Sequence, residues 1–483
     1  MEMITTYVIP GLYLALLIFV CLRVIVDTQE TPKTLAYLLV IIFLPVIGIL
    51  IYFIFGVNYR KRKIYSKKLS REQELAEQIE KEIQDYTFRN IEKYRDILQE
   101  SETTVRYLLN DTSSPLTEGN DVELLFNGDN KFERLKEELK KAHHHIHIEY
   151  YIIEEGRLIS DLRDILVQKA YEGVKVRIIY DDFGSGGLSN GFINELESNG
   201  IEVFPFHRVW LILFANRLNY RNHRKIVVID GQVGFTGGVN ISDRYINEFN
   251  GEKYWRDTHL MIRGNGVFKL QYLFFTSWRF CSGEELPVNQ NYFPPEVPTT
   301  NNSLVQIASG GPDSPRSTIL LTIMDAVSAA RERLYITTPY FIPDESLRKI
   351  IEFEALAGLD VRLLVPGRPE SFLINAAACS FYSRLLEAGV RIFLYEKGVI
   401  HSKTIIADNY LSIVGTANMD QRSFDLNFEV NAMVYDRNIN AELTSHFLHD
   451  LEQSREIDPV AFANRPQYKQ YGEGVARLLS PLM

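Results

Sequence analysis

The sequence predicts an α/β protein. Two tandem domains, each a mixed sheet flanked by helices, are related by a pseudo-two-fold axis and preceded by an N-terminal two-helix membrane anchor. Three observations predict this class. Two long apolar segments lie within the first 57 residues. A pattern of strands alternating with amphipathic helices then occurs twice, which indicates duplication of a whole domain. One polar motif also occurs twice, beginning at His223 and at His401.

Residues 1–57 are expected to form a transmembrane helical hairpin. Residues 7–26 are largely apolar apart from Pro10-Gly11 and Arg23, and residues 34–55 carry no charge. At about 1.5 Å of rise per residue, each segment covers roughly 30 Å, the thickness of one bilayer core. A cleaved signal peptide is the alternative for the first segment. It is disfavoured because no basic residue precedes the segment and no small-x-small cleavage site follows it.

A basic stretch follows the second apolar segment. Seven lysines and arginines lie between Arg60 and Arg71, and such an excess marks the cytoplasmic flank of a membrane helix. We therefore expect a multi-pass protein of the cell membrane with its catalytic domains on the cytoplasmic side, where the basic stretch attracts anionic lipid. Residues 58–115 are expected to contain this stretch and a connecting helix, because apolar residues recur there at helical spacing.

The two repeats are assigned to residues 116–290 and 291–483. Their similarity is visible where Gly173-VKVRIIYDD corresponds to Gly358-LDVRLLVPG. The alternation of strands and helices is typical of an α/β layer with a largely parallel sheet. Strands are expected near 123–126, 146–153, 174–180 and 201–206 in the first repeat, and near 334–338, 360–365 and 390–395 in the second.

The first repeat also contains an insertion at residues 207–222 that the second repeat lacks. Its apolar run from Trp210 to Phe214 is flanked by arginines. Two alternatives fit this pattern. The run could be buried by the other repeat, or it could insert into the lipid interface beside the active site. The role of the insertion therefore stays open.

Composition excludes several functions. With 52 basic and 62 acidic residues, a net charge of −10, the chain lacks the broad positive field that attracts nucleic acid. Cys21, Cys281 and Cys379 are too dispersed for a disulfide framework or a metal cluster. The histidines of segment 143–147 are expected at a solvated helix end, because no cysteine or carboxylate set accompanies them. We expect neither a metal nor another cofactor.

The repeated motif has the spacing His-x-Lys-x4-Asp. It comprises His223, Lys225 and Asp230 in the first copy and His401, Lys403 and Asp408 in the second. Each copy is followed by Gly-x-x-Asn, which ends at Asn240 or Asn418. Histidine and lysine two residues apart on an extended segment project to one face. Brought together by internal symmetry, the two copies would form a positive centre with amide donors, which suits one singly charged phosphodiester.

These residue types indicate phosphoryl transfer through histidine. One neutral imidazole can attack phosphorus while the other protonates the leaving oxygen, so the two are expected to differ in protonation state. Asp230 and Asp408 are interpreted as orienting and charge-balancing groups. Asp257 and Glu429 follow the motif asparagines, and we expect each to bond the far nitrogen of a histidine and fix its tautomer.

The paired motifs resemble the phospholipase D superfamily. The segments NYRNHRKIVVIDG, GGVNISDRY, YWRDTHLMI, TPYFIPDE, HSKT and GTANMDQRSF are similar, with nearly the whole chain, to bacterial cardiolipin synthases. The resemblance implies that two phosphatidylglycerol molecules become cardiolipin and glycerol through a phosphatidyl-histidine intermediate. His223 would attack and His401 would protonate the departing glycerol, although the reverse assignment stays open. Gly238 and Thr416 depart from the superfamily pattern, which often has serine there.

Other functions remain as alternatives. A hydrolytic phospholipase D, or an enzyme that exchanges another head group, would use the same motifs. The anchor and the acidic charge disfavour a nuclease, and the two intact motifs disfavour a catalytically silent membrane scaffold. Acyl preference, donor lipid and oligomeric state are not determined by the sequence.

Overall fold

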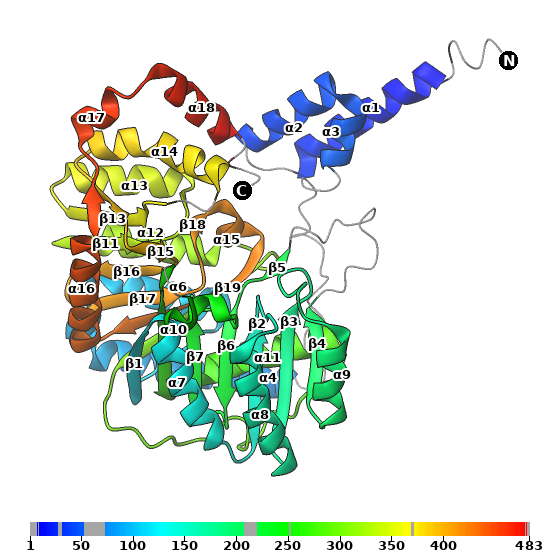
Figure 1. The fold of residues 1–483 in the computed structure, drawn as a ribbon, viewed down its shortest axis with the longest axis vertical. Coiled ribbons are helices and arrows are strands. Elements are labelled where there is room, and N and C mark those ends of the chain that lie inside the picture. The colour runs from blue at the N-terminus through cyan, green and yellow to red at the C-terminus, as the bar shows by residue number, and fades with distance from the viewer. Residues whose placement is uncertain are drawn as a thin grey trace.

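The computed structural model describes residues 7, 9–27, 31–52, 73–206, 220–250, 253–368, 371–478 and 480. A helical N-terminal part lies to one side of two stacked α/β units (Figure 1). The basic stretch 60–71 and residues 207–219, which contain the apolar run from Trp210 to Phe214, lie outside the described residues.

Three helices form the N-terminal part: α1 (Ile9–Asp27), α2 (Thr31–Phe43) and α3 (Pro45–Ile51). The second expected helix, 34–55, is therefore divided. Pro45 lacks a backbone N–H, so it interrupts α2 and begins α3 in its first turn. The helices share a small core that contains Val20, Ile41 and Tyr52. Within the described parts of the chain, none of the helices combines the length and apolar character needed to cross a membrane.

The expected connecting helix is also divided, into α4 (Gln73–Lys93), α5 (Arg95–Leu98) and α6 (Glu102–Thr112), with a 3-10 turn at Gln99–Ser101. The chain changes direction where Gln99 takes a φ of 49°. Although α6 precedes the first α/β unit in sequence, it packs on the second. Val105 and Leu108 share a core with Ile319, which lies in the second unit.

The first unit contains a seven-stranded sheet in the order β1-β9-β7-β6-β2-β3-β4. β2, β3 and β4 are parallel, whereas all other neighbours are antiparallel. The expectation of a largely parallel sheet is thus wrong, because the motif strands β6 and β7 form a tight hairpin. The strands are β1 (Asn120–Phe126), β2 (His145–Tyr150), β3 (Lys175–Asp181), β4 (Glu202–Phe206), β6 (Lys225–Ile229), β7 (Val233–Gly237) and β9 (Thr258–Gly264).

The second unit repeats this topology in the order β10-β19-β17-β16-β11-β13-β14 and adds β20 at the edge. The duplication expected from the sequence is therefore present in the fold. Its strands are β10 (Leu304–Gly310), β11 (Arg333–Thr337), β13 (Asp360–Pro366), β14 (Arg391–Tyr395), β16 (Thr404–Ala407), β17 (Leu411–Gly415), β19 (Asn427–Tyr435) and β20 (Ser454–Glu456).

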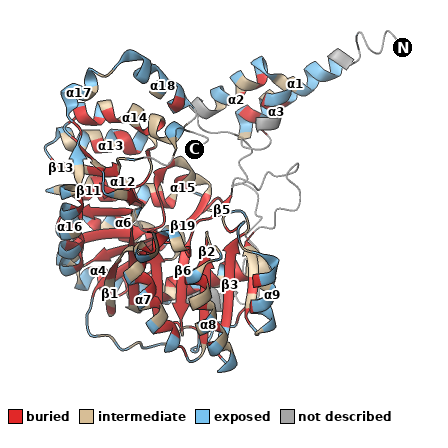
Figure 2. Cartoon of the chain, viewed as in Figure 1, coloured by how far each residue is buried: buried red, intermediate tan, exposed pale blue. Residues whose placement is uncertain are grey.

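Helices cover the outer face of each sheet. They are α7 (Asn127–Lys140), α8 (Arg157–Tyr171) and α9 (Asn190–Ser198) on the first sheet, and α12 (Thr318–Ala329), α13 (Glu345–Leu356) and α14 (Phe372–Glu387) on the second. Between the inner faces lies a shared core that includes Ile226 and Val228 of one sheet and Ile406 and Val430 of the other. This continuous buried region joins the units into one body (Figure 2).

The remaining elements lie around these layers. α11 (Val267–Ser282) and α16 (Arg437–Glu452) contribute to the shared core. The shorter elements are β5 (Arg221–Asn222), the 3-10 turn Asp243–Tyr245, α10 (Asn247–Asn250), β8 (Tyr254–Arg256), β12 (Phe341–Ile342), β15 (Gly398–Ile400), β18 (Met419–Asp420), α15 (Gln421–Asp425), α17 (Pro459–Ala463) and α18 (Gln467–Leu478).

The expected solvated helix end holds for His143, which is exposed just after α7, but not for the histidines that follow it in β2. His145 and His147 lie in β2 and are fully buried. Gln271 of α11 lies between them, 3.1 Å from His145 Nε2 and 2.8 Å from His147 Nδ1. Burial lowers the pKa of His145 to about 4. These two histidines are neutral core residues, because the strand that follows the helix lies in the interior of the sheet.

Candidate active site

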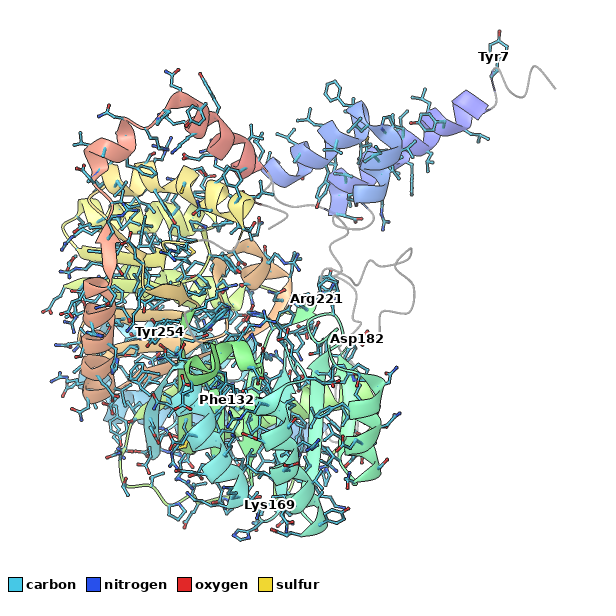
Figure 3. The ribbon with its side chains drawn as sticks, viewed as in Figure 1. Tyr7, Phe132, Lys169, Asp182, Arg221 and Tyr254 are labelled. Carbon is cyan, nitrogen blue, oxygen red and sulfur yellow. The ribbon has the colours of Figure 1, made fainter. Side chains whose placement is uncertain are left out.

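Two short strands cross between the units beside the motif histidines. β5 of the first unit pairs with β19 of the second, and β8 of the first pairs with β15 of the second. Figure 3 labels Arg221 and Tyr254, which begin β5 and β8 at the junction of the two units. The crossings place His223 next to β19 and His401 next to β8. The backbone N–H of His223 donates to Phe428 O at 3.0 Å, and that of His401 donates to Arg256 O at 2.8 Å.

Each motif histidine is paired with a carboxylate from the opposite unit. His223 Nδ1 lies 2.9 Å from Glu429 Oε1, and His401 Nδ1 lies 2.8 Å from Asp257 Oδ2. Both carboxylates are completely buried. The hydrogen bonds expected of Asp257 and Glu429 are therefore present, and they run crosswise. Each fixes Nδ1 of its imidazole as the bonded nitrogen and leaves Nε2 for another partner.

The two motif lysines lie in the same site. Lys225 Nζ donates to His223 O at 2.8 Å, and Lys403 Nζ donates to His401 O at 2.5 Å. Burial lowers the pKa of Lys225 to about 7, so an anion bound beside it would favour its charged form. The charge of Lys403 also lowers the pKa of His223, and that of Lys225 lowers the pKa of His401. The two half-sites thus act on each other electrostatically.

Both motif histidines favour the neutral form in the ligand-free site. Burial, and then the Lys403 cation, lower the pKa of His401 to about 4. Burial also lowers the pKa of His223, although the Glu429 carboxylate opposes this shift. The expectation that the resting histidines differ in protonation is therefore wrong for the ligand-free protein. An entering phosphodiester adds a negative charge, which favours protonation of an imidazole facing it.

Asp230 and Asp408 belong to the opposite end of the motif strands. Asp230 accepts backbone N–H groups of residues 143–145 at 2.8–2.9 Å, and Asp408 accepts those of residues 331–333 at 2.7–3.1 Å. Four strand residues separate each aspartate from its lysine, and five steps along a strand span roughly 17 Å. The two carboxylates thus orient the backbone that enters β2 and β11, which agrees with the orienting role expected of them.

The motif asparagines differ from each other. Asn240 Nδ2 donates to the Tyr245 hydroxyl at 2.8 Å, so this amide already has a partner. In contrast, the buried Oδ1 of Asn418 has no hydrogen-bond partner among the described residues. The amide of Asn418 is thus the more available of the two for a ligand.

The two departures from the superfamily pattern have structural reasons. A Cβ at Gly238 would lie 2.0 Å from Oδ1 of Asp257, so glycine admits this carboxylate to His401. At the equivalent place in the second unit, the Thr416 hydroxyl donates to Glu429. Gly238 thus leaves room for the Asp257 carboxylate, and Thr416 donates a hydrogen bond to the Glu429 carboxylate.

Three aromatic residues that sequence reasoning missed line the histidines. The Tyr151 ring lies 4.9 Å from that of His223, and the rings of Trp255 and Tyr245 lie 5.6 Å and 6.0 Å from that of His401. The sequence offered a signal for each, because Trp255 and Tyr245 lie in the quoted segments YWRDTHLMI and GGVNISDRY, and Tyr151 lies in the expected strand 146–153. Among the described residues there is no group of three His, Cys, Asp or Glu side chains that could hold a metal.

A duplicated α/β fold with two His-x-Lys motifs in one site defines an enzyme of the phospholipase D type. A family model described as cardiolipin synthase, PLD-like domain, matches residues 135–259 and 323–451. Another, described as phospholipase D-nuclease N-terminal, matches residues 14–56. The chain belongs to the cardiolipin synthase family.

Individual relatives cover almost the whole chain. The cardiolipin synthase of Alkalihalophilus pseudofirmus is 39% identical over 96% of this chain and 92% of its own. That of Listeria innocua is 38% identical over 99% of both chains. The solved structure of phosphatidylserine synthase from Haemophilus influenzae Rd KW20 has a TM-score of 0.58 at 15% identity. The match covers 79% of this chain and 98% of the chain in that structure. This similarity is one of fold.

Proposed function

We propose that this protein is a cardiolipin synthase that transfers a phosphatidyl group from one phosphatidylglycerol to a glycerol hydroxyl of another. The products are cardiolipin and glycerol, and the reaction is reversible. The crosswise pairing of His223 with Glu429 and of His401 with Asp257 carries this proposal, because it orients two imidazoles within one cationic site. The similarity to named cardiolipin synthases over 96% of the chain supports this choice of reaction.

In the first step, Nε2 of neutral His223 attacks phosphorus and the bond from phosphorus to the glycerol oxygen breaks. His401, protonated in the presence of the phosphodiester, gives its Nε2 proton to that oxygen, and glycerol leaves. Glu429 stabilises the positive charge on the phosphatidylated imidazole. In the second step, neutral His401 takes the proton of a hydroxyl on the second phosphatidylglycerol. The P–O bond forms as the P–N bond breaks, and His223 returns to its neutral form.

The basic and amide side chains hold the phosphoryl group during both steps. Lys225 and Lys403 place positive charge beside both histidines, where charge develops on the non-bridging oxygens. Asn418 supplies a hydrogen bond, and Asn240 supports its side of the site through Tyr245. Neither step requires a metal or another cofactor.

We infer that residues 1–57 serve as a hairpin anchor at the cell membrane, with the α/β units on the cytoplasmic side. Two observations support this. Large apolar side chains of α1 to α3 are exposed, among them Leu12, Phe19, Ile42, Phe43 and Ile47, a surface that lipid would cover. The seven basic residues between Arg60 and Arg71 favour the inner leaflet.

Product analysis tests the proposed reaction. Purified full-length protein is mixed with vesicles of labelled phosphatidylglycerol in the presence of a chelator, and the lipids are separated. Cardiolipin and free glycerol are expected in equal amounts, and His223→Ala and His401→Ala should each lower the rate by at least about a thousandfold. Phosphatidic acid as the main product would indicate a hydrolase instead. Full activity of either variant would refute the mechanism.

A further inference from the structure

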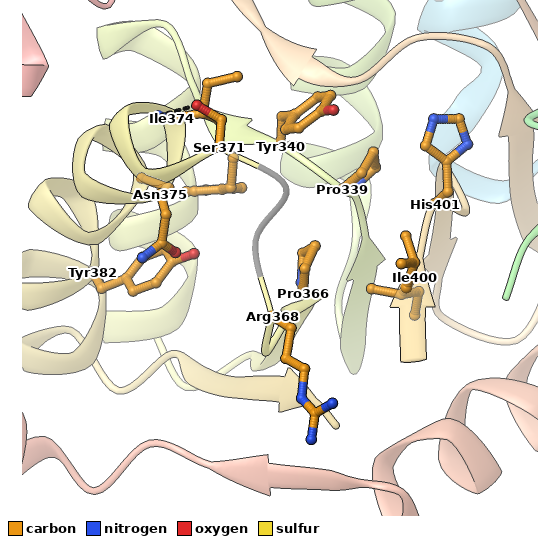
Figure 4. A pocket seen from close by; sticks show the side chains of 13 residues that line it. Pro339, Tyr340, Pro366, Arg368, Ser371, Ile374, Asn375, Tyr382, Ile400 and His401 are labelled. Atoms are coloured by element: carbon orange, nitrogen blue, oxygen red, sulfur yellow. Dashed lines mark hydrogen bonds between the residues drawn. The ribbon is translucent and has the colours of Figure 1, made fainter. Parts of the chain in front are cut away.

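A pocket lies beside His401, between β15 and α14 (Figure 4). His401 and Ile400 form one side, and Asn375 and Tyr382 of α14 form the other. Arg368 and Ser371, which follow β13, also line it. The polar groups of this pocket are thus brought to the imidazole that the proposed mechanism uses as acid and base.

Beside His223, hydrogen bonds tie together the loops that the structure describes. There, the loop after β3 packs against the loop after β2. Ser185 Oγ donates to Tyr151 O at 3.1 Å and accepts the N–H of Ile153 at 3.0 Å. Asp181 Oδ2 accepts the N–H of Asn222, the residue before His223, at 3.0 Å.

Most of the pocket lining is apolar, but Arg368, Ser371 and Asn375 supply polar groups suited to a polyol and its phosphate. The Asn375 amide can donate to and accept from an alcohol, and the Ser371 hydroxyl, which accepts the N–H of Ile374 at 3.4 Å, can donate to one. Arg368 is exposed and carries a guanidinium suited to a phosphate. The next residue after Ser371, Phe372, is 88% exposed, and Leu373 is 44% exposed. These exposed apolar side chains thus lie next to the polar side chains of the pocket, as expected where a lipid head group enters.

We propose that this pocket binds the glycerol head group that exchanges at His401, with Asn375 and Ser371 on its free hydroxyls and Arg368 on the phosphate of the acceptor lipid. The proposal rests on the proposed function and deepens it. Glycerol released in the first step leaves from this pocket, and the head group of the second phosphatidylglycerol then takes its place. The position of the pocket beside His401 also assigns the roles of the histidines: His401 serves the alcohol, and His223 carries the phosphatidyl group.

The test measures how the phosphatidyl-enzyme divides between water and alcohol. Full-length wild type, Asn375→Leu and Arg368→Ala are incubated with phosphatidylglycerol vesicles, and cardiolipin and phosphatidic acid are quantified. Each variant should lower the ratio of cardiolipin to phosphatidic acid by about tenfold, because the alcohol loses binding contacts and water does not. Ser380→Ala is the control on the same helix, since its hydroxyl bonds Ala377 O within α14.

Free glycerol provides a second readout in the reverse direction. With cardiolipin as the phosphatidyl donor, the KM for added glycerol should rise about tenfold in Asn375→Leu and remain unchanged in Ser380→Ala. Arg368 is exposed, so its variant is expected to fold normally. An unchanged product ratio and an unchanged KM in Asn375→Leu would overturn the assignment of the pocket. Failure of the proposed function is distinguishable, because the wild type itself would then make no cardiolipin.

Discussion

Nδ1 of His401 lies 2.8 Å from Oδ2 of Asp257, a carboxylate that belongs to the other half of the duplicated chain. The reciprocal pair, His223 and Glu429, crosses in the opposite direction. Because each histidine takes its orienting group from its partner unit, neither unit contains a complete catalytic pair. The two units therefore form one site, in which each unit supplies the carboxylate that bonds the histidine of the other.

Removing the charge of either orienting carboxylate should reduce catalysis while preserving the fold. Asp257→Asn and Glu429→Gln are expected to lower kcat by about 10²–10⁴, because an amide can stabilise the wrong imidazole tautomer. Steady-state cardiolipin synthesis measures the loss. Rapid quenching separates the two roles: Glu429→Gln should prevent formation of the phosphatidyl-histidine at His223. Glu123→Gln, at a partly buried residue paired with Arg134, serves as control, and wild-type kcat in both carboxylate variants would contradict the assigned roles.

Acid should destabilise the protein through its buried neutral histidines. Unfolding returns His401 from a pKa of about 4 to 6.5, so the unfolded chain binds the extra proton and stability falls as the pH drops from 6.5 to 4. The full difference is about 3 kcal/mol for this residue. Thermal melts over this range should show a shallower fall in Tm for His401→Asn. The exposed His449→Asn should behave as wild type, and parallel curves for all three proteins would exclude this origin.

The motif aspartates should affect stability more than chemistry. Asp230→Ala or Asp408→Ala leaves several backbone N–H groups without their charged acceptor, which we expect to cost about 3 kcal/mol of unfolding free energy. Urea denaturation measures this change. The folded fraction should retain kcat within about tenfold, because the carboxylates lie roughly 17 Å from the motif lysines. A loss of kcat as large as that of His223→Ala, with unchanged stability, would argue for a direct catalytic role.

The close approach at Gly238 gives a further test. A methyl group in Gly238→Ala would displace the Asp257 carboxylate, which a Cβ would meet at 2.0 Å. We expect a fall in kcat of at least about tenfold, with a smaller change in KM, because the orientation of His401 is disturbed. Gly474→Ala is the matched control, since nothing lies within 4 Å of its Cβ position. Equal activity of both variants would show that Asp257 can shift without consequence.

Several features of the site were predictable because they are local. The spacing of His223 and Lys225 places both on one face of an extended segment, and the repetition at His401 and Lys403 identifies a duplicated site. The helix 34–55 was expected as one element because its residues are continuously apolar. Pro45 nevertheless interrupts it, since proline lacks the backbone N–H that a continuous helix needs. The solvated position assigned to His145 failed for another reason: burial depends on which elements cover a strand, and α11 covers this one.

The sequence by itself determined the duplicated α/β architecture, the motif residues and the family to which the chain belongs, because these are written in spacing, periodicity and similarity along the chain. The tertiary structure alone decided which carboxylate serves which histidine, that Asp230 and Asp408 face away from the chemistry, and that a pocket lies beside His401. Those relationships join residues as far apart as Asp257 and His401. They depend on how two similar units pack against each other, and no pattern within one unit specifies that packing.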